Sequence, residues 1–234
     1  MTLELVLLCI GAYLLGSVPA AFLLAKWFYG IDIRQHGTGK TGASNVYRTT
    51  SKWLAIPVAL FDIGKGAFMV WLAQLLGMSA AAQAAVGLIT IAGHNWPVFL
   101  KFRGGRGIFT SLGVITMLCP WLGLIILVTP YLFAPIHQVA FGVFVDVSML
   151  PFLSWFLYQP LAIAAEDRLA VTIGFVILTL MVFVKRIATP RTEISRDVPP
   201  LQLLFNRLLF DRDIRDAGLW TQRKSRKQQD LNKE

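Results

Sequence analysis

The hydrophobic residues of this chain gather in long blocks, which short polar segments separate. The blocks cover residues 3–28, 54–76, 80–100, 107–119, 121–138, 143–164 and 169–185. An α-helix needs about 20 mostly apolar residues to cross the hydrocarbon core of a bilayer, and several blocks reach that length. Each block is therefore predicted to form one membrane helix. The chain is predicted to be an all-α polytopic membrane protein with seven transmembrane helices.

Pro120 separates the fourth and fifth blocks. A proline inside a helix removes a backbone hydrogen bond and clashes with the preceding turn. Residues 107–138 therefore form either one long helix or two shorter helices. The charge distribution favours two, because it requires an odd number of spans.

Most of the lysine and arginine residues fall in three parts of the chain. Lysine and arginine gather at 34–52, at 101–106 and from 185 to the end, whereas the turns near 77–80 and 119–121 carry no charge. Basic loops of membrane proteins lie mostly on the cytoplasmic side. All three basic segments share that side only with an odd number of spans. The prediction is therefore seven spans, with the N-terminus outside and the C-terminus inside.

The composition is typical of a membrane protein. Hydrophobic residues make up 56% of the 234 residues, charged residues make up 15%, and the mean hydropathy is +0.61. Soluble domains carry roughly a quarter charged residues. The net charge of +9 is therefore assigned to the cytoplasmic loops and tail, and no nucleic-acid partner is predicted. The two cysteines lack the spacing of metal ligands, and no metal or cofactor is predicted.

The chain divides into a seven-helix domain at 1–187 and a basic cytoplasmic tail at 188–234. The tail contains two adjacent prolines at 199–200, followed by the segment LQLLFNRLLF at 201–210. The apolar residues of this segment recur at helical spacing, which is typical of an amphipathic helix in the membrane interface. The alternative is a weakly ordered, solvated tail.

Two glycine-rich segments lie between predicted spans on the same side of the membrane. The first glycine-rich loop (37–45) reads GTGKTGASN, and the second glycine-rich loop (104–107) reads GGRG. Glycine-rich turns direct several backbone N–H groups toward one anion. Two such loops with neighbouring cations indicate a protein that binds phosphorylated substrates at the membrane surface. A nucleotide-binding P-loop is rejected, because Arg34 stands where that motif requires its first glycine.

The order and spacing of short motifs resemble a known family. The motifs are Gly16-Ser17-Val18-Pro19, Asp32-Ile33-Arg34, the first glycine-rich loop, Arg48, Asp62-x-x-Lys65-Gly66, Gly93-His94 and the second glycine-rich loop. This pattern over residues 11–113 resembles the acyl-phosphate:glycerol-3-phosphate acyltransferases, the PlsY family of bacterial inner-membrane enzymes. The resemblance implies seven membrane helices in the bacterial plasma membrane and an active site at the cytoplasmic face. It implies no metal and no coenzyme A.

The reaction that the resemblance implies moves a fatty acyl group from acyl phosphate to the 1-hydroxyl of glycerol 3-phosphate. The product is lysophosphatidic acid, a precursor in phospholipid synthesis. Both substrates carry phosphate, so the enzyme needs glycine-rich backbone and fixed cations for two anions. The matching positions identify Thr38, Arg48 and Arg106 as catalytic residues. The implied substrate-binding residues are Gly37, Gly39, Lys40, Gly42, Ser44, Asn45, Gly104, Gly105 and Gly107.

The chain departs from the family pattern at three places. Lys40 stands where the family usually has asparagine, and Arg106 stands where it has lysine. The third family motif, a pattern like HRxNIxRL at the end of the last helix, is replaced at residues 185–189 by KRIAT, without the histidine or the asparagine. Asn206-Arg207-Leu208-Leu209 resembles the end of that motif, about twenty residues later.

These departures keep two other functions open. The first is a catalytically weak paralogue that binds or regulates phospholipid precursors. The second is a transporter of an organic phosphate, which predicts charged residues distributed along a path through the spans. The charges of this chain instead cluster on one face, so the transporter is the least favoured of the three.

Four of the ionisable residues inside the predicted spans are interpreted individually. Asp62 and Lys65 share one face of the second span and are interpreted as a structural pair rather than a catalytic one. His94 is interpreted as a core histidine that holds a neighbouring backbone. Asp146, near the inner end of the sixth span, is predicted to be exposed at the interface.

Overall fold

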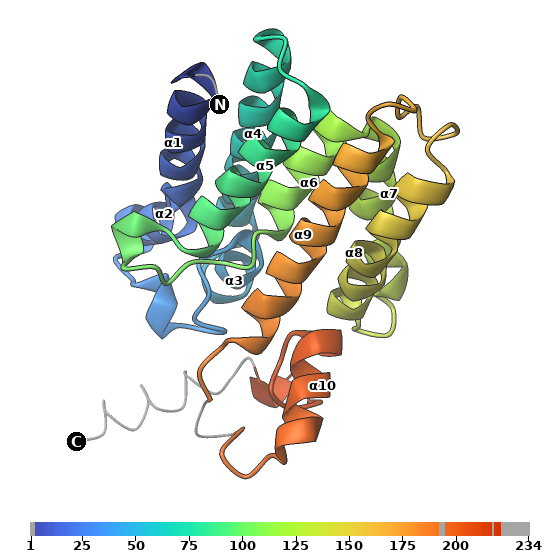
Figure 1. Ribbon diagram of the computed structural model, residues 1–234. Helices are drawn as coiled ribbons and strands as arrows, with labels where there is room; N and C mark the ends of the chain where they lie inside the picture. Colours follow the sequence, from blue (N-terminus) through green and yellow to red (C-terminus); the bar gives the residue numbers. More distant parts are fainter. Residues whose placement is uncertain (1–2, 192–194, 217, 221–234) are drawn as a thin grey trace, which may run out of the picture.

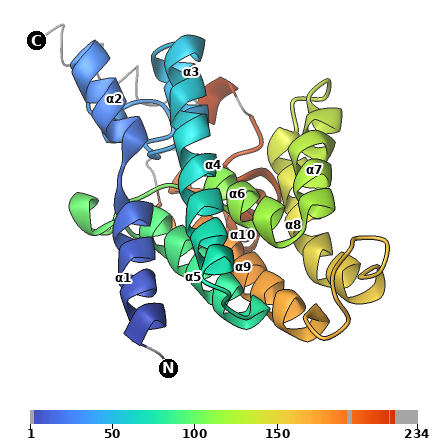
Figure 2. The same ribbon diagram turned by 90° about the horizontal axis from the view of Figure 1, so that it is seen from above.

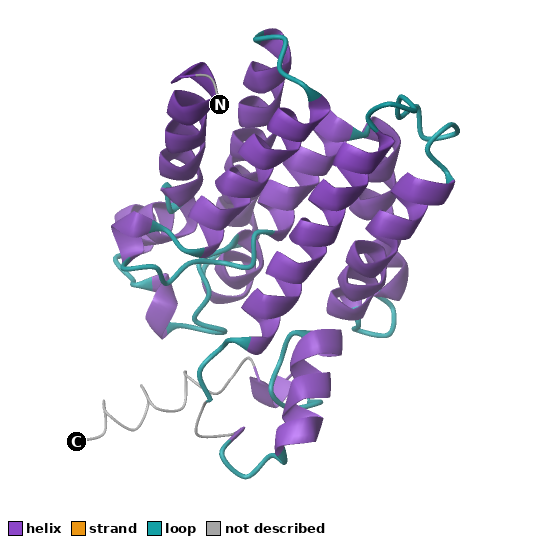
Figure 3. Ribbon diagram, viewed as in Figure 1, coloured by secondary structure: helices purple, strands orange, loops and turns teal. Residues whose placement is uncertain are grey.

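The structure is a computed structural model, and it describes residues 3–191, 195–216 and 218–220. Across these residues the regular structure is helical, without strands (Figure 3). The α-helices are α1 (Leu3–Ser17), α2 (Ala20–Tyr29), α3 (Ala43–Thr49), α4 (Lys52–Leu75), α5 (Ala80–Asn95), α6 (Ile108–Leu118), α7 (Pro120–Val128), α8 (Val139–Phe156), α9 (Arg168–Ile187) and α10 (Pro200–Phe210). Short 3-10 helices are η1 (Ile33–Gln35), η2 (Val98–Leu100) and η3 (Thr129–Phe133).

The long helices lie side by side in one bundle (Figure 1). Seen from above, α1 and α2 lie at one side and α7 and α8 at the other, with α4, α5, α6 and α9 between them (Figure 2). The most extensive packing joins α4 to α6 and α1 to α5. A Cβ at Gly66 of α4 would overlap the carbonyl oxygen of Thr110, and one at Gly113 of α6 would overlap that of Ile63. These glycines therefore let the two backbones approach closely, as small residues do in membrane helices.

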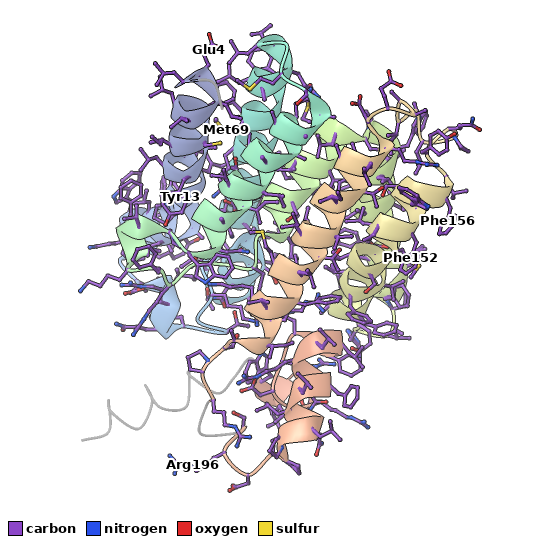
Figure 4. The ribbon with its side chains drawn as sticks, viewed as in Figure 1. Glu4, Tyr13, Met69, Phe152, Phe156 and Arg196 are labelled. Atoms are coloured by element: carbon purple, nitrogen blue, oxygen red, sulfur yellow. The ribbon has the colours of Figure 1, made fainter. Side chains whose placement is uncertain are left out.

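The outer surface of the bundle is apolar. Phe152 and Phe156 project from α8 away from the other helices (Figure 4), with exposed fractions of 58% and 72%. Other exposed apolar side chains are Leu60, Phe68, Trp71, Leu124, Ile173, Ile177 and Leu180. Such an extensive apolar surface is stable only against lipid or a partner.

Four helical segments of the described chain are long and apolar enough to cross a membrane. They are Leu3–Tyr29, Lys52–Leu75, Val139–Phe156 and Arg168–Ile187, and shorter apolar helices occupy Ile108–Leu118 and Pro120–Phe133. Together with the apolar surface, these segments confirm the prediction of an all-α membrane protein with several spans.

Each of the seven apolar blocks contains a helix. The helix boundaries also show whether the chain breaks at Pro120 and whether the first block is one continuous helix. The predicted break at Pro120 is confirmed, because α6 ends at Leu118 and α7 begins at Pro120. The first predicted span matches the candidate span Leu3–Tyr29, but its helix is interrupted, because α1 ends at Ser17 and α2 begins at Ala20. Pro19 has no N–H to donate and disfavours a helical conformation of the residue before it, so the helix is interrupted here.

The two ends of the bundle carry different segments. The start of α1, the α4–α5 turn and the α8–α9 loop lie at one end (Figure 1). Both glycine-rich loops and α10 lie at the other end (Figure 1). Glu4 and Arg196, labelled in Figure 4, mark these two ends. The described residues of the three basic segments therefore share one end of the molecule, as the charge distribution predicts.

The C-terminal segment packs against the bundle, with α10 in contact with α8 and α9. Residues 200–210 form helix α10, the first of the two alternatives for this segment, and its place in the membrane interface stays a prediction. Its polar residues Asn206 and Arg207 are buried, whereas the apolar Leu201 and Phe205 are exposed. Arg207 forms an ion pair with Asp213 at 2.8 Å, which offsets the cost of burying its charge.

Candidate functional site

The first glycine-rich loop is held by the side chain of Asn45, which is buried in α3. Its amide nitrogen donates to the carbonyl oxygens of Ile33, His36 and Lys40 at 3.2, 3.1 and 3.0 Å. Its amide oxygen accepts the backbone N–H of Thr38 at 2.8 Å. Because these bonds use both ends of the amide, Asn45 orders the loop. Its contact with substrate stays a prediction.

The glycines of this loop allow a tight turn beside α3. Gly37 has a φ of +53°, and a Cβ there would overlap the side chains of Asn45 and Thr49. A larger residue would therefore be strained at this position. The N–H of Gly39 donates to the carbonyl of His36 at 2.9 Å, which closes the turn.

The remaining residues assigned to the first loop lie on or before α3. Gly42 caps the start of α3 and has open space beside it. Ser44 and Arg48 are exposed on α3. Burial and the nearby charge of Arg48 lower the pKa of Arg212, which follows α10. α3 therefore faces the C-terminal segment, and an interaction of Ser44 or Arg48 with substrate stays a prediction.

The second glycine-rich loop packs on the end of α5 and touches the first loop. A Cβ at Gly104 would overlap the carbonyl oxygen of His94. A Cβ at Gly105 would overlap the His94 ring and the carbonyl oxygen of Thr41, which belongs to the first loop. Gly107 has a φ of +72° and leads directly into α6. Glycine is needed here because both the backbone conformation and the space exclude a side chain.

Cations from the two loops meet at one carboxylate, Asp211, which lies directly after α10. Lys40 Nζ is 3.0 Å from Asp211 Oδ1, and Arg106 Nη2 is 2.5 Å from the same oxygen. Arg106 Nη1 also donates to the carbonyl of Lys185 and, at 3.0 Å, to Thr189 Oγ1. Arg106 thus joins the second loop, the end of α9 and the C-terminal segment.

The basic side chains at the end of α9 bond to other segments of the protein. Lys185 donates to the carbonyl of Asn95 and lies 5.0 Å from the ring centroid of Trp96. Arg186 is 2% exposed and donates to the carbonyl oxygens of Leu208 and Ala140. We refer to four side chains at this end of the bundle as the cationic cluster: Lys40, Arg106, Lys185 and Arg186.

The charges of the cationic cluster shift the protonation of the groups around it. Burial would raise the pKa of Asp211, but Arg106, Lys40 and Arg186 outweigh burial and hold that pKa well below its usual range. Burial lowers the pKa of Lys40 to about 7, although the charge of Asp211 opposes this. A lysine is charged only below its pKa, so Lys40 loses its charge as the pH rises through about 7.

A buried ionic network lies beneath the loops, inside the bundle. Asp62 Oδ1 is 2.8 Å from Lys65 Nζ and 3.3 Å from His94 Nδ1. Lys65 also donates to the carbonyl oxygens of Gly16, at 3.1 Å, and Val18, at 3.4 Å. The pairing of Asp62 with Lys65 is confirmed. His94 lies in the core, as predicted, and its backbone carbonyl accepts the N–H of Gly105 at 3.3 Å, whereas its ring nitrogen faces the side chains of Asp62 and Lys65.

A small recess joins this network to the first glycine-rich loop. Ser17, Thr41, Asp62 and His94 are among its lining residues. The prediction that Asp146 is exposed at the interface is wrong, because it is 9% exposed and accepts a bond from Thr129 at 2.6 Å. No group of three or more potential metal ligands occurs among the residues that the structure describes.

Asp211 was not among the residues predicted to form the site. Asn206 and Arg207, which resemble the end of the third family motif, bond to Asp213 and to backbone carbonyls rather than to the two loops. The only signal for Asp211 was an acidic residue at the end of an apolar helix. Such a signal does not reveal a partner that lies 171 residues away, at Lys40.

Three comparisons relate the chain to known proteins. The profile of a family described as "Glycerol-3-phosphate acyltransferase" matches residues 6–195. The chain is 43% identical over 225 residues to glycerol-3-phosphate acyltransferase 5 of Dehalococcoides mccartyi, covering 96% of each protein. It is 45% identical over 213 residues to glycerol-3-phosphate acyltransferase 4 of another strain of that species, covering 91% of each.

The fold also resembles solved structures. The crystal structure of PlsY, an integral membrane glycerol 3-phosphate acyltransferase, in its glycerol 3-phosphate form has a TM-score of 0.69 and 27% identity. The similarity covers 78% of this chain and 88% of that chain. The lysophosphatidic acid form of PlsY has a TM-score of 0.67 and 28% identity over the same shares of the two chains.

Proposed function

This chain belongs to the glycerol-3-phosphate acyltransferase family, and we propose that its acyl donor is an acyl phosphate and its acceptor the 1-hydroxyl of glycerol 3-phosphate. The products are lysophosphatidic acid and inorganic phosphate. The observation that carries the proposal is the convergence of Lys40 and Arg106, from two glycine-rich loops, at one end of an apolar helix bundle. Phosphate-bearing substrates with a lipid chain require this combination of anion site and membrane surface.

The chemical step needs charge stabilisation more than a protein base. The hydroxyl oxygen of glycerol 3-phosphate attacks the carbonyl carbon of acyl phosphate and forms the new ester bond. The bond from that carbon to the phosphate oxygen breaks, and the departing phosphate takes the hydroxyl proton. Fixed cations and backbone N–H groups stabilise the negative charge that develops on the carbonyl oxygen.

The two loops divide the substrates between them in this proposal. Arg106 binds the phosphate of glycerol 3-phosphate through its planar guanidinium. The hydroxyl of Thr38 donates a hydrogen bond to the phosphate of the acyl donor, and the positive charge of Arg48 neutralises part of the phosphate charge. The other assigned residues of the loops contribute their backbone N–H groups and close packing, and the acyl chain stays in the lipid.

The donor is tested by giving purified protein glycerol 3-phosphate and one fatty acyl chain in two forms, as acyl phosphate and as the coenzyme A thioester. We expect lysophosphatidic acid from acyl phosphate alone. Release of inorganic phosphate should match ester formation one to one. Turnover with the thioester would contradict the donor assignment, and binding of both substrates without turnover would favour a catalytically weak paralogue.

We further propose seven spans in a bacterial inner membrane, with the site on the cytoplasmic face. In a variant with both native cysteines replaced, Glu166→Cys should react with an impermeant thiol reagent in intact cells. Gln35→Cys should react only after the membrane is opened. Both positions are exposed in the protein, so their reactivity reports the side of the membrane. The reverse pattern would contradict the topology and the side of the active site.

A further inference from the structure

Asp211 reaches the site from a part of the chain that the family profile does not cover. The match to the family ends at residue 195, and α10 follows it. The chain leaves α10 in a left-handed turn at Asp211, with a φ of +54°. Its backbone N–H donates to the carbonyl of Arg207. The fold of the C-terminal segment therefore sets the position of this carboxylate.

One carboxylate oxygen serves both loops. Lys40 and Arg106 contact the same atom, Oδ1 of Asp211, at 3.0 and 2.5 Å. The side chains of all three residues are mostly buried, with exposed fractions of 18%, 11% and 22% for Lys40, Arg106 and Asp211. Two cations this close and this buried repel each other strongly unless an anion lies between them. Within the described residues, no other carboxylate forms an ion pair with either cation.

We propose that Asp211 is a positioning residue of the acyltransferase site, which holds Lys40 and Arg106 on one carboxylate and joins the two glycine-rich loops into one phosphate-binding surface. The proposal rests on the function proposed above. It assigns a role in the reaction to the C-terminal segment. Asp211 contacts Arg106, which also bonds to Lys185 and Thr189, where the third family motif is altered.

The charge balance leaves room for substrate beside Asp211. The cationic cluster brings four basic side chains to this end of the bundle, and Asp211 forms ion pairs with two of them, Lys40 and Arg106. The cluster therefore keeps an excess of positive charge with which to bind a phosphate group. In this role Asp211 orients the cations, while the cations bind the substrate.

The first test compares wild type with Asp211→Asn, which keeps the shape of the side chain and removes its charge. We expect kcat/KM to fall about ten- to a hundred-fold, the effect of losing a buried charge-assisted contact. Asp197→Asn is the matched control, because Asp197 is exposed in the same segment, and it should remain close to wild type. Wild-type turnover tests the proposed function, whereas the ratio of variant to wild type tests Asp211.

The second test separates positioning from a purely structural role. In a Lys40→Met background, Asp211→Asn should cost less than in wild type, because one of the two cations it orients is absent. A structural role would cost the same in both backgrounds. Equal costs, or an Asp211→Asn variant as active as wild type or more active, would overturn the proposal. Greater activity would instead mark Asp211 as a competitor of the substrate phosphate.

The pH profile provides a third measurement. The charged groups that face Lys40 are Asp211, Arg106 and Arg186. Among them only Asp211 favours the charged form of Lys40. If charged Lys40 binds the substrate phosphate, activity should fall as the pH rises through about 7, and Asp211→Asn should move this fall to lower pH. If that variant does not fold, Asp211→Glu replaces it, since it keeps the charge and should keep the wild-type profile. A profile displaced to lower pH in Asp211→Glu would overturn the proposal.

Discussion

Replacing Lys65 with methionine is expected to destabilise the protein by about 3–5 kcal/mol, the usual cost of removing one partner of a buried ion pair. Asp62 is 2% exposed and lies within the apolar helix α4, so its charge would remain without the ammonium group 2.8 Å away. The carbonyl oxygen of Gly16, at the break between α1 and α2, would also lose its bond from Lys65, and that of Val18 would keep only the N–H of Ala20, at 3.2 Å.

Thermal unfolding in detergent measures this effect. Asp62→Asn combined with Lys65→Met should recover part of the lost stability, because neither partner then carries an unpaired charge. Lys26→Met makes the same chemical change at an exposed position of α2 and should leave the unfolding midpoint nearly unchanged. If Lys65→Met behaves like Lys26→Met, the network does not stabilise the fold.

Replacing Arg106 with alanine is expected to lower kcat/KM for glycerol 3-phosphate about ten- to a hundred-fold through the loss of charge-assisted contacts. The KM for glycerol 3-phosphate should rise more than the KM for acyl phosphate, because Arg106 is assigned to the former. The guanidinium also joins Asp211, the carbonyl of Lys185 and Thr189 in the free protein. Its loss therefore removes both a ligand and a link between three segments.

Two further variants sharpen this experiment. Arg106→Lys restores the charge without the planar fork, and it should recover activity only in part. Arg103→Ala removes an exposed arginine three positions earlier and should leave both KM values close to wild type. An Arg106→Ala protein that folds normally with an unchanged KM for glycerol 3-phosphate would mean that the second loop serves only as a tight turn.

The helices and the end of the bundle that carries the loops were predictable from local pattern. In lipid every backbone N–H and C=O must be bonded within its own segment, so a long apolar run has one stable form. The basic segments fall at one end because each helix reverses the direction of the chain. The family was equally recognisable, since short motifs of fixed spacing carry it, and the family match confirms it.

The contacts of individual polar residues were not predictable in this way. Asn45 was assigned to substrate, and the structure shows its amide bonded to the loop around it. Asp146 looked like an interface residue from its position along the span, yet η3 folds over it and Thr129 binds it. Burial depends on which elements pack together, and the spacing within one helix does not contain that information.

The sequence by itself determined a helical membrane protein of this family, with two glycine-rich loops and their cations at one end. Hydropathy, charge and glycine act through neighbouring backbone, so their effects can be read along the chain. Only the tertiary structure decided that Lys40 and Arg106 meet, and that Asp211 lies between them. An ion pair between residues 171 positions apart exists only because α10 packs on α8 and α9 and returns the chain to the loops.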